Sequence, residues 1–135
     1  MIRDIEQWIS ELRTSKKLVV VEGPKDQKAL LQCGIRNVAV LSKQALYATA
    51  ERIASEHASV VLLTDFDKKG KALYGALKKQ FQRLGVKVDT RFREFLQRET
   101  TLSHIEGLHT YINNSVNHNN VNQHGTRKKR RSMGA

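Results

Sequence analysis

The chain is organised around one stretch, residues 60–70, which reads Val-Val-Leu-Leu-Thr-Asp-Phe-Asp-Lys-Lys-Gly. Its first four residues are apolar without a break, a pattern typical of a short strand buried on both faces in a parallel sheet. Two carboxylates follow at Asp65 and Asp67, and apolar side chains recur at helical spacing after Gly70. The two acids therefore lie where a buried strand passes into a helix, which is the edge of an open α/β sheet where ligands bind.

Strands and helices are expected to alternate on both sides of this stretch. From apolar runs and one alternating pattern, strands are predicted at 17–22, 37–41, 59–64 and 86–90. From apolar residues at helical spacing, helices are predicted at 2–14, 25–33, 43–56, 68–84 and 103–112. Ser103 with Glu106 three residues later resembles a capping box for the last helix. The pattern predicts an α/β fold with a mainly parallel four-stranded sheet, an N-terminal helix and helices on both faces.

Charge and length limit the classes of function. The chain has 135 residues and 24 Lys and Arg against 13 Asp and Glu, a net charge of +11. Five of the basic residues lie at 127–131, so the rest of the chain still carries +6. We expect one domain at 1–112 and a disordered basic tail at 113–135, because Asn, His and basic residues cannot form a core. This balance favours a polyanionic partner, nucleic acid first.

The remaining composition indicates a soluble, cytoplasmic protein with no membrane partner. The single cysteine, Cys33, excludes an intramolecular disulfide and a zinc site built from several cysteines. The first residues lack the apolar segment of a signal peptide. No apolar run approaches the ~20 residues that a membrane-spanning helix needs.

A third carboxylate, Glu22, ends the first predicted strand. All strands of a parallel sheet end at the same edge, so Glu22, Asp65 and Asp67 converge if those two strands are neighbours. Like charges about 4 Å apart repel by roughly 4 kcal/mol near a protein surface. Mg²⁺, with Mn²⁺ as the alternative ion, would turn that repulsion into attraction. The other interpretation is that Asp67 only caps the helix beginning near Lys68.

Residues that flank the acids fall into two groups. Gly23, Pro24 and Gly70 are predicted to form the tight turns from strand to helix. Several basic residues are candidates for binding phosphate, although those near the acids are equally compatible with a solvated face. They are Lys25, Lys68, Lys69 and Lys71 near the acids and Arg127, Lys128, Lys129, Arg130 and Arg131 in the tail.

The motifs Val19-Val-Val-Glu-Gly23 and Asp65-Phe-Asp67 resemble the Toprim domain, over about residues 17–90. Toprim is the Rossmann-like module of topoisomerases, bacterial-type primases, overcoming-lysogenization-defect nucleases and the ribonuclease that matures 5S ribosomal RNA. The chain looks like one of the small stand-alone Toprim proteins of archaea and bacteria. The resemblance implies that Glu22 is a general acid or base and that Asp65 and Asp67 hold Mg²⁺. Many relatives carry a further acid where this chain has Lys71.

Other classes of protein share parts of these motifs. Haloacid-dehalogenase phosphatases carry Asp-x-Asp after the first strand rather than the third, and response-regulator receivers need paired acids where this chain has only Glu22. A nuclease acting on RNA or DNA is favoured over a primase, because a chain of this length cannot build both a nucleotide site and a template channel. The alternative is a non-catalytic basic α/β module that binds RNA, or a subunit of a nucleic-acid-processing complex.

Overall fold

A computed structural model describes residues 1–42 and 44–115, which form a three-layer α/β domain. The central sheet has four strands in the order β2-β1-β3-β4, and every pair is parallel. The strands are β1 (Leu18–Val21), β2 (Val38–Val40), β3 (Ser59–Leu63) and β4 (Lys87–Asp89). The predicted α/β class and the four-stranded parallel sheet are confirmed.

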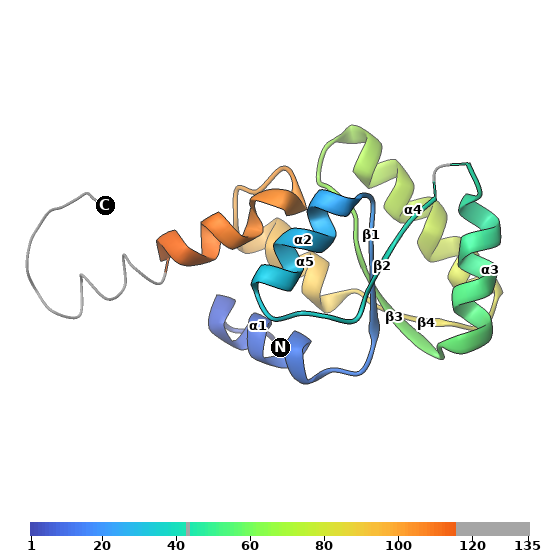
Figure 1. The fold of residues 1–135 in the computed structure, drawn as a ribbon, viewed down its shortest axis with the longest axis horizontal. Helices are drawn as coiled ribbons and strands as arrows, with labels where there is room; N and C mark the ends of the chain where they lie inside the picture. Colours follow the sequence, from blue (N-terminus) through green and yellow to red (C-terminus); the bar gives the residue numbers. More distant parts are fainter. Residues whose placement is uncertain (43, 116–135) are drawn as a thin grey trace, which may run out of the picture.

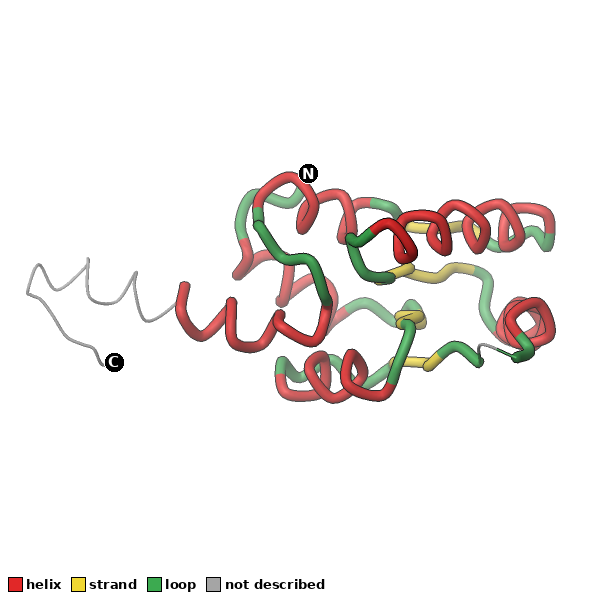
Figure 2. The backbone as a smooth tube through the Cα atoms, turned by 90° about the horizontal axis from the view of Figure 1, so that it is seen from above, coloured by secondary structure: helices red, strands yellow, loops and turns green. Residues whose placement is uncertain are grey.

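The two middle strands are buried on both faces because their apolar side chains alternate between two separate cores. Val19 and Val61 pack into one core, and Val20 and Leu62 pack into the other. The first core is covered by α1 (Ile5–Thr14), α2 (Pro24–Gln32), α5 (Arg91–Glu99) and the short 3₁₀ turn η1 (Ile105–Gly107). The second is covered by α3 (Leu46–Glu56) and α4 (Lys68–Arg83). Figures 1 and 2 show the strands between these two helical layers.

The N-terminal helix is held in the first layer by Trp8. This side chain is fully buried, and its Nε1–H donates to the carbonyl of Phe92 over 2.8 Å. The Trp8 and Phe92 rings meet edge to face with centroids 5.9 Å apart. Burial of two large rings contributes several kcal/mol, roughly 1.5–3 for each such side chain, so α1 is tied firmly to the start of α5.

Three predicted helix starts were wrong. α1 begins at Ile5 rather than residue 2. α3 begins at Leu46 rather than residue 43, with Ala45 as an N-cap that offers no side-chain hydrogen bond. The capping box at Ser103 and Glu106 does not form, and η1 begins instead after His104. The start differs because the Ser103 carbonyl and the Ile105 amide form hydrogen bonds with the loop after β3 instead.

The C-terminal part of the described chain is helical from residue 108 to residue 115, three residues beyond the predicted limit of the domain. The predicted phosphate-binding cluster at 127–131 lies outside the described residues. Among the helices of the described part, none has the length and apolar character required to span a membrane.

Candidate metal centre at the carboxyl edge of the sheet

Glu22 and Asp65 emerge side by side because β1 and β3 are adjacent and in register. Val21 pairs with Leu63, so Glu22 leaves the sheet level with Thr64, one residue before Asp65 and at the same edge. The Oε2 atom of Glu22 accepts a hydrogen bond from the amide of Asp65 over 2.7 Å. The structure therefore ties the acid after the first strand directly to the backbone of the Asp-x-Asp loop.

Asp67 is both a helix cap and a member of an acidic group. Its Oδ1 accepts a hydrogen bond from the amide of Gly70 over 2.7 Å and caps α4. Its Oδ2 lies 3.4 Å from Nε2 of His104. The two interpretations of Asp67 are thus compatible, because one oxygen serves the helix while the other faces the site.

Gly70 lies in the first turn of α4, where any side chain would collide with the loop. A Cβ atom built at this position would approach the carbonyl oxygen of Asp65 to 2.1 Å. The hydroxyl of Thr64 donates to the Gly70 carbonyl over 2.8 Å. This close packing fixes how Asp65 and Asp67 are presented. After β1, Gly23 is the N-cap and Pro24 the first residue of α2, and a Cβ at Gly23 would meet no atom closer than 3.9 Å.

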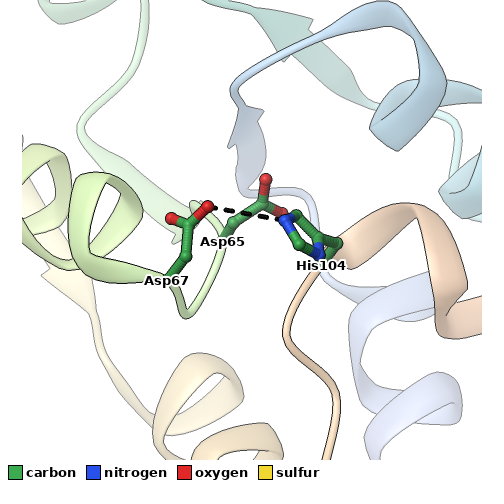
Figure 3. A group of neighbouring side chains, drawn as sticks. All are labelled: Asp65, Asp67 and His104. Atoms are coloured by element: carbon green, nitrogen blue, oxygen red, sulfur yellow. Dashed lines mark ion pairs between the residues drawn. The ribbon is translucent and has the colours of Figure 1, made fainter.

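Asp65, Asp67 and His104 each place one potential ligand atom within 4.8 Å of the others (Figure 3). Asp65 is half-buried, while Asp67 and His104 are exposed. Two carboxylate oxygens and an imidazole nitrogen at this spacing suit a divalent cation, with water completing its coordination. The donor set present thus fits a divalent cation. Glu22 is not a member of this three-residue group, and its role as a ligand stays a prediction.

Arg93 supports the Asp-x-Asp loop from behind. The residue is 4% exposed, and its guanidinium donates hydrogen bonds to the carbonyls of Thr64 and Asp65 over 3.3 Å and 2.8 Å. It also lies between the rings of Phe66 and Tyr74, at 4.6 Å and 4.3 Å from their centroids. Burial lowers the pKa of Arg93, but an arginine remains charged at neutral pH. A buried cation therefore holds the backbone that carries Asp65.

A cleft of about 700 Å³ opens in front of these groups. Its lining includes Glu22, Asp26, Asp65, His104 and Glu106. Burial, together with the negative charge of Asp65, raises the pKa of Asp26 to about 6. The cleft is thus strongly acidic at its floor, as expected of a site that takes up cations.

Two of the predicted phosphate-binding lysines line hollows at this edge of the sheet. Lys25 lines the cleft, and Lys69 lines a smaller apolar hollow of about 290 Å³ beside Glu22. Lys25, Lys68, Lys69 and Lys71 are all exposed, and no ion pair within residues 1–42 and 44–115 involves them. Three of them lie in the first turn of α4, where the helix dipole also favours anions.

Sequence reasoning missed four residues of this region: Asp26, Arg93, His104 and Glu106. Nothing in the sequence singled out Asp26, a first-turn acid of α2 whose carboxylate accepts a hydrogen bond from the Gly23 amide over 3.0 Å. Glu106 was assigned to a capping box. His104 and Arg93 carried no signal, because only the folded chain brings them to the Asp-x-Asp loop.

Comparisons with known proteins agree with this arrangement. The family model of the Toprim domain matches residues 16–91, a range that includes Glu22, Asp65 and Asp67 but ends before His104. A UPF0292 protein of Methanocaldococcus jannaschii is 30% identical over 107 residues, covering 76% of this chain and 84% of that protein. A UPF0292 protein of Pyrococcus horikoshii is 38% identical over 93 residues, covering 68% and 70%.

A solved structure of a protein from Aquifex aeolicus shares the fold, with a TM-score of 0.70 and 34% sequence identity. The match covers 77% of this chain and 97% of that one. The order of the parallel strands, the acids at their carboxyl ends and the matched range lead to one conclusion. The chain belongs to the Toprim domain family.

Proposed function

We propose that the protein is a metal-dependent enzyme that cleaves phosphodiester bonds in nucleic acid. Asp65 and Asp67 are the ligands for Mg²⁺ or Mn²⁺, and Glu22 transfers a proton. The observation that carries the proposal is the convergence of these three acids at one edge of the sheet, with the Glu22 carboxylate 2.7 Å from the amide of Asp65. Family membership supports it, because the matched range contains all three acids.

The protein groups have separate tasks in this mechanism. When bound, a divalent cation supplies positive charge that stabilises the negative charge developing on the phosphoryl group. The Asp65 amide holds Oε2 of Glu22 and leaves Oε1 to accept or donate a proton. The lysine in the cleft, Lys25, and those in the first turn of α4 bind neighbouring phosphates of the strand. The basic charge of the chain raises the local concentration of nucleic acid.

The second candidate is a basic module that binds RNA, alone or in a processing complex, without catalysis. The net charge of +11 favours it, because binding to phosphates needs charge but no proton transfer. The two candidates differ in metal-dependent turnover, which only the enzyme shows.

Cleavage of labelled RNA and DNA panels with Mg²⁺ or Mn²⁺, against a chelator control, tests the proposal. In Glu22→Gln, the amide oxygen of glutamine can still accept the hydrogen bond from the Asp65 amide, but the side chain cannot exchange a proton near neutral pH. Activity should fall by roughly 10²–10⁴-fold while nucleic-acid affinity changes little. Glu51→Gln, on the exposed face of α3, is the matched control and should cleave normally. Chelator-resistant cleavage, or full activity of Glu22→Gln, contradicts the mechanism. Binding without any turnover favours the second candidate.

A further inference from the structure

We propose that His104 is a third protein ligand of the metal, and that its imidazole makes the site prefer Mn²⁺ over Mg²⁺. This inference rests on the proposed metal site at Asp65 and Asp67. His104 lies beyond the range matched by the family model. It comes from the segment that follows α5, so the preference depends on a part of the chain outside the Toprim motif.

The backbone on either side of His104 is bonded to the Asp-x-Asp loop. The carbonyl of Ser103 accepts a hydrogen bond from the amide of Phe66 over 2.9 Å. The amide of Ile105 donates to Oδ1 of Asp65 over 2.8 Å. The side chain of Ile105 is itself fully buried in the first core. His104 is therefore held in place relative to both aspartates, although its own side chain is 48% exposed.

The imidazole is also oriented toward the aspartates. Oγ of Ser103 lies 2.9 Å from Nδ1, and Nε2 lies 3.4 Å from Oδ2 of Asp67. When Nδ1–H donates to the Ser103 hydroxyl, Nε2 is left with a free lone pair on the side of the carboxylates. A histidine that binds a metal usually donates its other ring N–H in this way, to a partner that fixes its tautomer and orientation.

The chemistry of the third donor sets the metal preference. Mg²⁺ is bound through one or two carboxylates and keeps several waters, so it gains little from a nitrogen ligand. Imidazole suits first-row transition ions, and affinity for them rises from Mn²⁺ to Cu²⁺. His104 should therefore strengthen the binding of Mn²⁺ and change that of Mg²⁺ little. The competing role is a simple ion pair between His104 and Asp67, which would give no metal preference.

Pulsed electron paramagnetic resonance of the full chain with one equivalent of Mn²⁺ tests the direct contact. The wild type should show modulation from a bound ¹⁴N nucleus, and His104→Ala should lose it. Titrations should show the Kd for Mn²⁺ rising about 10- to 100-fold in His104→Ala, the range seen when metal ligands lose even an outer partner. The Kd for Mg²⁺ should change by less than about threefold. His57→Ala is the matched control, because His57 precedes β3 at the opposite edge of the sheet.

Two results separate this inference from the proposed function. If Mn²⁺ binds without nitrogen coupling, or if the coupling and both Kd values are unchanged in His104→Ala, His104 is not a ligand and the site at the aspartates remains. If Asp67→Asn binds Mn²⁺ as tightly as the wild type, or if the wild type binds neither ion, the proposed metal site at the aspartates is refuted. The proposal that His104 is a ligand is then refuted too.

Discussion

Replacing Arg93 by methionine is expected to destabilise the domain by about 3–5 kcal/mol. The guanidinium makes two hydrogen bonds to backbone carbonyls, one buried and one partly buried, and such bonds from a charged donor contribute about 1.5–3 kcal/mol each. The longer bond, 3.3 Å to Thr64, is placed at the low end of that range. Its contacts with the rings of Phe66 and Tyr74 add about 0.5–2 kcal/mol, of which methionine recovers part through packing.

Urea denaturation followed by circular dichroism measures this loss. Arg93→Lys keeps the positive charge but cannot bond both carbonyls from one planar group, so it should fall between wild type and Arg93→Met. Arg98→Met is the control in the same helix, because Arg98 is 46% exposed, with an ion pair to its neighbour Glu99 and its guanidinium 5.9 Å from the centroid of the Phe95 ring. That variant should lose less than about 1 kcal/mol. If Arg93→Met loses no more than Arg98→Met, the guanidinium does not support the Asp-x-Asp loop.

Two further predictions concern the acidic cleft and the basic tail. The pKa of Asp26 is about 6 in the folded protein, above its value of 3.8 in an unfolded chain. Ionisation of Asp26 therefore lowers the stability of the fold as pH rises between these two values, and the loss is complete above about pH 6. Without metal, Asp26→Asn should therefore raise the Tm at pH 8 and give little or no gain at pH 4; an equal gain at both pH values contradicts this. Changing the five basic residues at 127–131 to alanine should reduce the slope of log Kd against log salt on duplex DNA by up to about 4.5, and an unchanged slope removes the tail from binding.

The sheet and the two acidic motifs were predictable because each depends on a short stretch of sequence. The unbroken apolar runs before Glu22 and Asp65 correspond to β1 and β3, which are buried on both faces. Once those strands are parallel neighbours, the acids after them must meet. The dual role of Asp67 could also be foreseen in part, because aspartate at a helix start caps it whether or not it binds a metal.

The residues that hold the metal site in place could not be predicted, because their role depends on contacts between segments far apart in the sequence. Ile105 donates to Asp65 across a sequence separation of 40 residues, and this contact brings His104 to the aspartates. Arg93 looks like one of several charged residues on an amphipathic helix. Its burial follows from how α5 packs against β3 behind the loop, and no local pattern shows this.

The most direct test of the proposed site is the response of stability to metal in wild type and in Asp67→Asn. The side-chain oxygen of asparagine can still accept a hydrogen bond from the Gly70 amide, and asparagine is about as good an N-cap as aspartate, so the fold should be retained. A bound ion stabilises the native state by RT ln(1 + [L]/Kd), or about 2.7 kcal/mol at 100 times Kd. Melting curves in chelator and in millimolar Mn²⁺ at matched ionic strength should show a clear rise in Tm for wild type and a much smaller rise for the variant. Equal rises in both proteins would show that Asp67 does not bind the metal.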